Sequence, residues 1–398
     1  MPAGTQIPIA SHAASRRFAG RVGLVYGTVF GLIGTHTPFF PVWLRAIGID
    51  ASWIGIISAV PSVTRFTILP FITALAERRH ALRGAIVLTA FATVAGFALI
   101  GAQRRPVAVF LAYVVTCAFW TPMLPLTEAY APRGVLRYGL KYGPLRLSGS
   151  AAFVVGALVC GLLVELITAE RLIWIIVAAA LLGAASSLAL QHLDRPASGT
   201  AAVHGDTALL RDGGFLAAIF AAALIQGSHA AYYAFASINW QAHGLGGFTI
   251  AALWGLGVLA EIMVFALSPR FGLQPSSLMA IGAFSAVARW LIMAQEPQLA
   301  LLAPLQLAHG LTYGLTQVGT MGLLVRLVPD HVTARGQGYL AACSGIVTSV
   351  ASILSGATYA HYGQGAYYLM AGMGASGAIL ILLMRRRLIY PHSSGAGG

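Results

Sequence analysis

The chain has 398 residues, of which 58% are hydrophobic and only 9% charged, and its mean hydropathy is +0.79. A soluble globular chain carries charge on about a quarter of its residues, so these few charges could not cover a water-exposed surface. The composition therefore excludes a soluble enzyme and indicates a protein that crosses a membrane many times.

Apolar segments follow one another along the whole chain, each near the ~20 residues that a bilayer-crossing helix needs. Charge clusters, glycines and prolines separate them. We expect an all-α integral membrane protein with twelve transmembrane helices, placed roughly at 22–45, 53–75, 84–103, 107–130, 144–167, 171–191, 214–240, 248–269, 275–295, 298–326, 336–361 and 365–384.

The longest polar segment, HLDRPASGTAAVHGDTALLRDG, divides these helices six and six. Its Gly, Pro, Ser and Asp content is typical of a linker. We therefore expect an N-terminal six-helix bundle over 1–193, a cytoplasmic linker over 194–213 and a C-terminal six-helix bundle over 214–398. Two bundles joined in this way are typical of a secondary transporter with its substrate site between them.

Basic residues fall mainly on one side of the expected helices. With the N-terminus inside, 18 of the 24 Lys and Arg residues face the cytoplasm, whereas the outer side holds only Arg45, Arg104, Arg105 and Arg171. This positive-inside asymmetry predicts a multi-pass protein of the inner (plasma) membrane with both termini in the cytoplasm. It also accounts for the net charge of +13 without a nucleic-acid partner.

Enzyme motifs are missing from the sequence, which has no P-loop, no HExxH, no GxSxG and no clustered Cys/His spacing. Its three cysteines lie inside apolar segments, where lone thiols are expected instead of disulfides. We therefore expect neither an enzyme nor an ATP-driven pump, with no metal and no bound cofactor.

Charged side chains are rare inside the expected helices. Because a charge in the bilayer core costs about 3 kcal/mol or more, such a residue usually faces a cavity or a partner. These residues are Arg65, Glu128, Arg146, Glu261 and Arg289, joined by the histidines His36, His229 and His309.

Glu128 and Arg146 lie on either side of a predicted hairpin between the fourth and fifth helices. Pro132 is expected to end the fourth helix and Pro144 to begin the fifth, which puts both charges at one depth. Glu128 then lies in the last turn of its helix and Arg146 in the first turn of its own. The helix dipole disfavours each charge at these positions by about 0.5 kcal/mol, so helix stability does not explain them. They either hold a ligand or gate the hairpin, or they form a salt bridge that fixes it.

The remaining polar positions each leave two interpretations open. Arg65 either contacts an anion in the cavity or pairs with a backbone carbonyl or an acid. His36, shortly before Pro38, either lines the cavity or is a buried, hydrogen-bonded imidazole. His229 and Tyr233 share one helix face, which either lines the cavity or packs against neighbouring helices.

Several segments carry a family resemblance, among them PFFPVWL, TEA with YGPLRLSGSAAF, SHAAYYAFASINWQAHG and LQLAHGLTYG. The chain resembles the major facilitator superfamily of transporters over nearly its whole length, and within it the lactose-permease-like and phenylpropionate-permease-like branch. The superfamily signature between helices 2 and 3 survives in part as TALAERRHALR. There, Glu77 and Arg78 match a gating motif, whereas Thr73 and His80 replace glycines.

The resemblance implies a substrate site in the first half. In the lactose permease, a Glu and an Arg with the spacing of Glu128 and Arg146 bind the sugar, and a tryptophan stacks on it where this chain has Phe153. A phenyl ring packs readily against an aromatic ligand, so Phe153 favours an aromatic substrate over a sugar.

The resemblance also implies a proton-coupling network in the second half, which Glu261, Arg289 and His309 match. Thr312 stands where the titrating glutamate of the permease is expected. Glu261 is then the best remaining proton carrier, with His309 as a relay. The alternatives are a structural ion pair between Glu261 and Arg289 and an interhelical hydrogen bond at His309.

Together these implications predict a proton-coupled symporter that works by alternating access as a monomer. Its partners are a small organic solute and the lipid bilayer, and the proton is its coupling ion. The solute is an aromatic carboxylate such as a phenylpropionate, or a sugar. Proton-driven efflux of hydrophobic drugs is the second hypothesis, and a non-transporting membrane sensor is the third.

Overall fold

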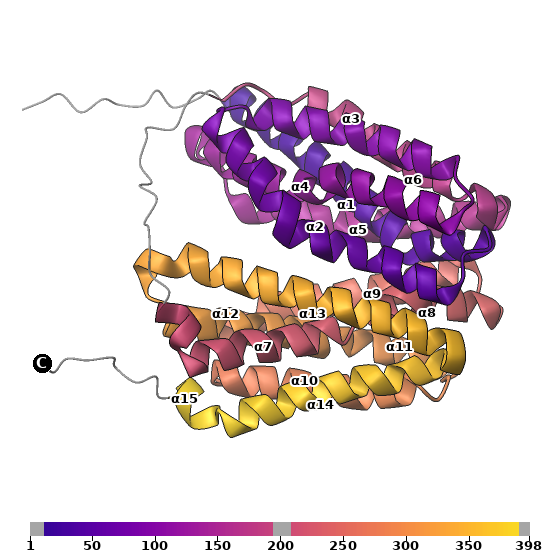
Figure 1. Ribbon diagram of the computed structural model, residues 1–398. Coiled ribbons are helices and arrows are strands. Elements are labelled where there is room, and N and C mark those ends of the chain that lie inside the picture. Colours follow the sequence, from indigo (N-terminus) through magenta and orange to yellow (C-terminus); the bar gives the residue numbers. More distant parts are fainter. Residues whose placement is uncertain (1–11, 194–207, 390–398) are drawn as a thin grey trace, which may run out of the picture.

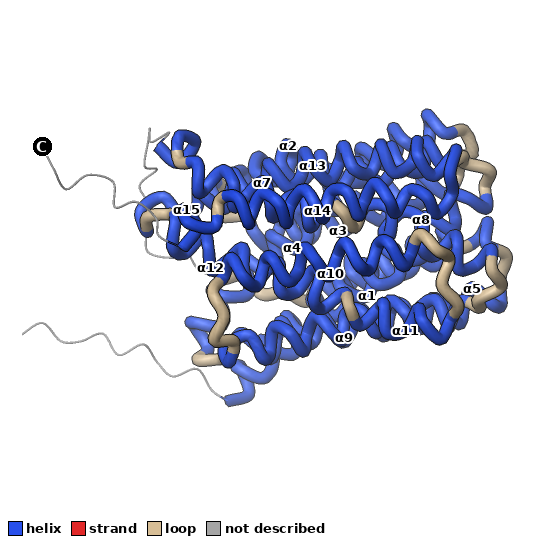
Figure 2. The backbone as a smooth tube through the Cα atoms, turned by 90° about the horizontal axis from the view of Figure 1, so that it is seen from below, coloured by secondary structure: helices blue, strands red, loops and turns tan. Residues whose placement is uncertain are grey.

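The computed structural model describes residues 12–193 and 208–389, which are helical with short connections (Figure 2). Within these two ranges no strand is present. The long helices run side by side along one axis of the molecule, and their loops gather at its two ends (Figure 2). Helices suit a membrane because each one satisfies its own backbone N–H and C=O groups, for which lipid offers no partner.

The first half of the chain forms six long helices. Asp50 Oδ1 accepts a hydrogen bond from Trp53 N at 3.0 Å and so caps the second helix. Gly139 ends the fourth helix in the left-handed conformation, with φ 62°. The helices are α1 His12–Ala46, α2 Ala51–Arg78, α3 Leu82–Gly101, α4 Pro106–Tyr138, α5 Tyr142–Leu166 and α6 Ile173–Leu188, with the 3-10 turn η1 Ala169–Arg171 before α6.

Pro132 does not end α4, contrary to the expectation from the sequence. The helix continues through this proline, so Glu128 lies well inside α4 and not in its last turn. The helix-dipole argument therefore fails for Glu128, although Arg146 still lies near the start of α5. A proline is tolerated inside a transmembrane helix because neighbouring helices and side chains can satisfy the backbone carbonyl that it leaves free.

The second half contains two interrupted helices where the sequence predicts continuous ones. The seventh expected span is divided into α7 and α8 at His229, and the tenth into α11, a π-helix η4 and α12 next to His309. The elements are α7 Gly213–Gly227, α8 Ala230–Ala242, α9 Gly247–Leu267, α10 Pro275–Met293, α11 Leu299–Leu307, η4 Gly310–Leu315, α12 Thr316–Leu327, α13 Thr333–Tyr362, α14 Ala366–Leu383 and α15 Arg385–Ile389.

The helices lie in two groups, α1–α6 and α7–α15, one above the other in Figure 1. Across the boundary, α2 packs against α13 and α5 against α9. Ten helical stretches of the described residues are long and apolar enough to cross a membrane. One of them, Thr333–Leu383, contains both α13 and α14, and the interrupted run from α11 to α12 comes in addition.

Glycine contacts join the two groups closely at one end of the molecule, where α1 ends and α2 begins. We call it the far end, because it lies opposite α15 (Figure 1). A Cβ atom at Gly55 on α2 would lie 2.6 Å from the Cα of Gly356 on α13, and Gly161 on α5 faces Gly247 on α9 in the same way. Only glycine allows two backbones to approach so closely, so the far end is closed.

Candidate functional site

Glu128 and Arg146 form an ion pair between α4 and α5. Arg146 Nε donates to Glu128 Oε1 at 3.0 Å. The two side chains are 38% and 35% exposed, respectively, so water or a ligand can reach both. A pair with this exposure contributes only about 0–1 kcal/mol to stability. A ligand with complementary groups can therefore take the place of either partner without a large cost.

The aromatic ring beside this ion pair comes from α1. The guanidinium of Arg146 lies over the ring of Phe30, 4.4 Å from its centroid, in a cation–π contact. Gly149 on α5 makes room for this ring, because a Cβ there would overlap it. Phe153, the aromatic residue expected at this place, is buried, and its backbone packs on Gly34 of α1. Phe30 was not among the site residues expected from the sequence.

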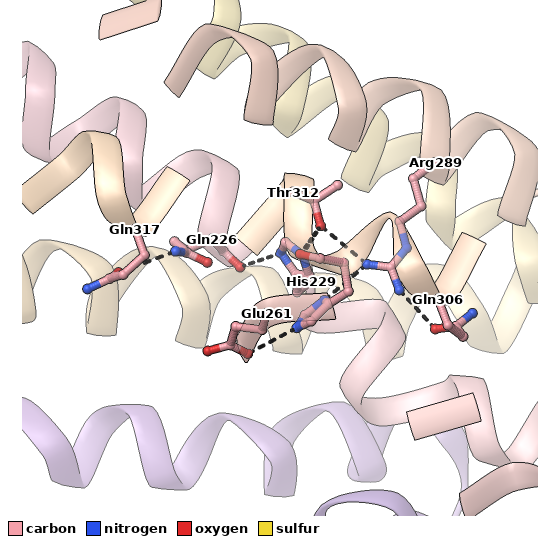
Figure 3. A network of polar contacts seen from close by, with 8 residues as sticks. Gln226, His229, Glu261, Arg289, Gln306, Thr312 and Gln317 are labelled. Atoms are coloured by element: carbon pink, nitrogen blue, oxygen red, sulfur yellow. Dashed lines mark hydrogen bonds and ion pairs between the residues drawn. The ribbon is translucent and has the colours of Figure 1, made fainter. Parts of the chain in front are cut away.

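Arg289 on α10 is the charged centre of the second half, although its side chain is only 1% exposed. Its Nη2 donates to Gln306 Oε1 at 2.9 Å, while its Nη1 donates to His309 Nδ1 at 3.1 Å and to Thr312 Oγ1 at 3.3 Å. Figure 3 shows Gln306 of α11 and Thr312 of η4 converging on the guanidinium.

Aromatic faces complete the surroundings of Arg289. The guanidinium lies 4.8 Å from the ring centroid of Tyr232 and 4.6 Å from that of Trp290. None of its partners among the described residues is a carboxylate, so neutral acceptors and ring quadrupoles balance this charge. The direct Glu261–Arg289 ion pair that the sequence left open is therefore not formed.

The hydrogens of this network all point away from Arg289, because a guanidinium can only donate. His309 Nδ1 must accept, which leaves the proton of a neutral ring on Nε2, directed at Glu261 Oε2 at a distance of 3.8 Å. Thr312 Oγ1 accepts from Arg289 and passes its own hydrogen to His229 Nε2 at 3.0 Å. While Arg289 occupies Nδ1, His309 takes up no second proton, and its Nε2 hydrogen is directed toward Glu261.

The interruption between α7 and α8 determines the hydrogen-bond partners of the His229 ring. The chain turns at Ser228 and His229, which leaves carbonyls at the end of α7 without their usual helical donors. His229 Nδ1 lies 3.2 Å from both Ile225 O and Gln226 O, so Nδ1 carries the hydrogen and Nε2 is the acceptor. The break thus fixes the tautomer that the network requires.

The π-helix η4 begins directly after His309. Gly310 brings it against α9, since a Cβ at Gly310 would lie 2.8 Å from the carbonyl oxygen of Ala260. This approach sets His309 beside Glu261, which follows Ala260 on α9. Single π-helical turns are rare and frequently occur at functional sites. Nothing in the sequence pattern distinguishes η4 from an ordinary helix.

Glu261 lies where the two halves face each other. Its side chain is 25% exposed, and the neutral ring of His309 lies 3.8 Å from its carboxylate. The positive charge of Arg146, from the first half, acts on this carboxylate. Tyr233 on α8 lies close enough to feel the charge of Glu261 and stacks near His229, with ring centroids 6.0 Å apart.

Arg65 approaches the same region from α2. Its side chain is exposed, and it makes no hydrogen bond or ion pair with any residue in the described ranges. Its charge acts on the phenol of Tyr313 in η4, on the opposite half. Arg146 and Arg65 of the first half thus lie within electrostatic reach of Glu261 and Tyr313 of the second, respectively.

His36 stays apart from this group. It is buried within the first half, where its Nε2 lies 3.1 Å from Tyr113 Oη and its ring contacts Phe40 and Trp120. This placement fits the second interpretation of His36, a buried and hydrogen-bonded imidazole. The gating-motif residues Glu77 and Arg78 are exposed in the last turn of α2, away from the facing charges.

Two groups of apolar helices with charged side chains between them are typical of a secondary transporter. The family comparison agrees with this class. The model of the MFS_1 like family matches residues 21–370, and the chain therefore belongs to the major facilitator superfamily of transporters. It is not an enzyme, in line with the missing enzyme motifs.

Two curated relatives match along nearly their whole length. The chain is 33% identical over 366 residues to the "Probable 3-phenylpropionic acid transporter" of Escherichia coli (strain K12), covering 88% of this chain and 93% of the relative. It is 26% identical over 373 residues to the "Maltose permease" of Geobacillus stearothermophilus, covering 91% of this chain and 93% of that one.

Solved structures share the fold. The nucleoside transporter NupG superposes with a TM-score of 0.79 at 15% identity, covering 93% of this chain and 99% of NupG. A bacterial homologue of the human lysosomal transporter Spinster gives a TM-score of 0.69 at 12% identity, covering 96% and 98%. The all-helical membrane fold and the superfamily expected from the sequence are confirmed.

Proposed function

We propose that this protein is a proton-coupled symporter that takes up an aromatic carboxylate such as a phenylpropionate. It acts as a monomer in the plasma membrane with both termini in the cytoplasm. Two units, 1–193 and 214–398, rock against each other about the substrate, and the segment 194–213 links them. The relative named for 3-phenylpropionic acid supports this substrate class.

One observation carries the proposal: Arg65 is a cation inside an apolar helix without an acidic partner among the described residues. An unneutralised charge at this depth is costly unless a ligand or water compensates it. Arg146 already has Glu128 as a partner, so Arg65 is the cation free to bind a substrate carboxylate. The rings of Phe30 and Tyr313 lie near these two arginines and offer faces for an aromatic ring.

Glu261 is the proton carrier in this scheme. Of the acidic side chains that the structure describes, only Glu128 and Glu261 lie more than one turn inside a helix. Glu128 is held by Arg146, whereas Glu261 has the neutral His309 beside it and therefore loses little when it is protonated. A protonated Glu261 also removes the repulsion that a carboxylate substrate meets in the site.

Uptake into membrane vesicles tests the proposal. With an inward proton gradient, vesicles containing the protein should accumulate labelled 3-phenylpropionate, and a protonophore should abolish this accumulation. Arg65→Gln should weaken apparent substrate affinity about 10- to 100-fold, the cost of one lost charged hydrogen bond. Arg45→Gln, which changes a charge at the end of α1, is the matched control and should behave like the wild type.

Other outcomes of the same assay separate the competing hypotheses. Accumulation of maltose in place of 3-phenylpropionate would assign the protein to the sugar carriers and overturn the role of Arg65. Gradient-driven extrusion of a hydrophobic dye from the vesicles would support drug efflux. The absence of any transport, with the protein verified in the membrane, would leave the sensor hypothesis.

A further inference from the structure

A basic cavity lies outside the transport site, where the start of α3 meets α4 and the chain that follows α6. Its volume is about 280 Å³, close to the lower end for small-molecule sites. The side chains that give it its character are those of His80, Arg83, Tyr130, Arg133 and His192. It lies at the end of the molecule opposite the glycine contacts, which the positive-inside rule assigns to the cytoplasm.

The cations of this cavity are held in two different ways. Arg83 is fixed, because its Nε donates to Leu190 O at 2.6 Å and its Nη1 lies 3.4 Å from His192 Nε2. Arg133, on α4, makes no hydrogen bond or ion pair within the described part of the chain. No carboxylate belongs to the described lining residues. The cavity therefore presents one anchored and one free guanidinium to an anion.

The backbone adds to this positive potential. The cavity is lined by Ala81, Leu82 and Gly84 at the start of α3, in addition to Arg83. No side chain caps this helix and its first turn has no acidic residue, so its first N–H groups keep their partial positive charge. A phosphate group has the charge and acceptors that such a helix start and two arginines can bind together.

The elements that form the cavity also carry exposed leucines, which would suit an amphiphilic ligand. Arg83 Nη2 donates to the carbonyl of Leu188, whose side chain is 52% exposed. Leu136 lies one turn beyond Arg133 on α4 and is 85% exposed. Leu88, one turn beyond Gly84 on α3, is 65% exposed. A free anion gains nothing from this apolar surface, whereas the acyl chains of a lipid can pack against it.

We propose that this cavity binds the phosphate headgroup of an anionic phospholipid from the cytoplasmic leaflet. Arg133 and the start of α3 hold the phosphate, Arg83 anchors the end of α6, and the leucines contact the acyl chains. Basic pockets between transmembrane helices on the cytoplasmic side recognise such headgroups in this manner. The bound lipid would join α3, α4 and α6 on the outside of the first bundle. Lipid binding here is independent of which substrate the protein carries.

Thermal unfolding of the purified protein in detergent tests the site. We would measure Tm against increasing phosphatidylglycerol, phosphatidylcholine and sodium phosphate at one ionic strength, because surface charges respond to salt. Wild-type protein should be stabilised saturably by phosphatidylglycerol only. Arg133→Gln should raise the half-saturating concentration roughly 5- to 10-fold. Arg270→Gln, an exposed charge change in the 3-10 turn that follows α9, should leave it unchanged.

Further variants keep the test decisive. Arg133 is unpartnered among the described residues, so its variant should fold, which gel filtration checks. His80 has φ 50°, a region that asparagine tolerates, so His80→Asn gives a second lipid-weakened variant. Unchanged lipid affinity in both variants, or an equal loss in Arg270→Gln, would overturn the proposal. Equal stabilisation by sodium phosphate would show a soluble anion as the ligand and overturn the lipid assignment.

Discussion

The two halves of the candidate site hold their charges in opposite ways. In the first half, Arg146 pairs with a carboxylate, and both side chains are about a third exposed or slightly more. In the second half, Arg289 is almost fully buried and has only neutral partners among the described residues. An accessible pair is cheap to separate, whereas a buried network is costly to disturb.

This difference separates two tasks that one transport cycle needs. The exposed pair and Arg65 can exchange partners with a substrate during each cycle. The buried network keeps His309 in one tautomer, with its Nε2 hydrogen directed toward Glu261 at the boundary between the halves. In the proposed mechanism, binding belongs mainly to the first half and proton coupling to the second. Substitutions in the buried network should then mainly lower the free energy of unfolding, and substitutions of the exposed pair should mainly lower uptake. The loss of stability should be the largest of these effects.

Removal of the buried cation should lower the free energy of unfolding more than any other substitution described here. Arg289→Leu leaves His309 Nδ1 and Gln306 Oε1 without their donor, so the free energy of unfolding should fall by about 3 kcal/mol. Arg146→Leu should lower it by about 1 kcal/mol or less. Denaturant unfolding of both variants in the same detergent measures the two costs. Equal costs would contradict the contrast between the halves.

A substitution that opens the far end should have the second largest effect. Gly55→Val would place atoms inside the backbone of α13, and overpacking of this kind costs about 2 kcal/mol. The bundles should separate at that end, and thiol labelling of a cysteine introduced beside Gly356 should become faster. Gly372→Ala is the control, because a Cβ there meets nothing within 4 Å. Unchanged labelling in Gly55→Val would show that these glycines do not hold the far end closed.

A charge swap decides between the two roles of the exposed pair. Glu128→Arg combined with Arg146→Glu keeps an ion pair between α4 and α5, so the free energy of unfolding should change by about 1 kcal/mol or less. If the pair also binds substrate, uptake should fall at least about tenfold, because the cation is then on the wrong helix. Normal uptake by the swapped protein would mean that the pair only fixes the hairpin.

The smallest effect is expected at His309. In His309→Gln the amide keeps one acceptor for Arg289 and one donor for Glu261 but cannot titrate. If His309 orients Glu261, gradient-driven uptake should stay within about fivefold of the wild type. His309→Leu, which has neither group, should lose far more. A complete loss of coupling in His309→Gln would restore the relay that the family resemblance implies.

The sequence was sufficient for the fold. Long apolar segments of about 20 residues and the scarcity of charge predict a helical membrane protein, because lipid leaves few alternatives. The charges inside these segments also predicted that partners would be found beside them, as Arg146 and Arg289 show. Glu128 and Arg146 could be paired from spacing alone, because a hairpin sets two residues at one depth.

The side-chain partners could not be predicted from the sequence. Phe30 stands beside Arg146 because Gly149 leaves room for its ring, a contact between distant segments. Pro132 was expected to end α4, yet the helix continues through it. The π-helix η4 and the break at His229 follow from tertiary contacts, not from local periodicity, and these two irregularities build the network around Arg289.

The most direct test of the central claim is Glu261→Gln in proteoliposomes. We predict that this variant loses accumulation of 3-phenylpropionate driven by a proton gradient but still exchanges labelled for unlabelled substrate, since a glutamine imitates the protonated carrier. Glu170→Gln, an exposed acidic position before α6, should retain both activities. Gradient-driven accumulation by Glu261→Gln at the wild-type level would contradict the assignment of Glu261 as the proton carrier.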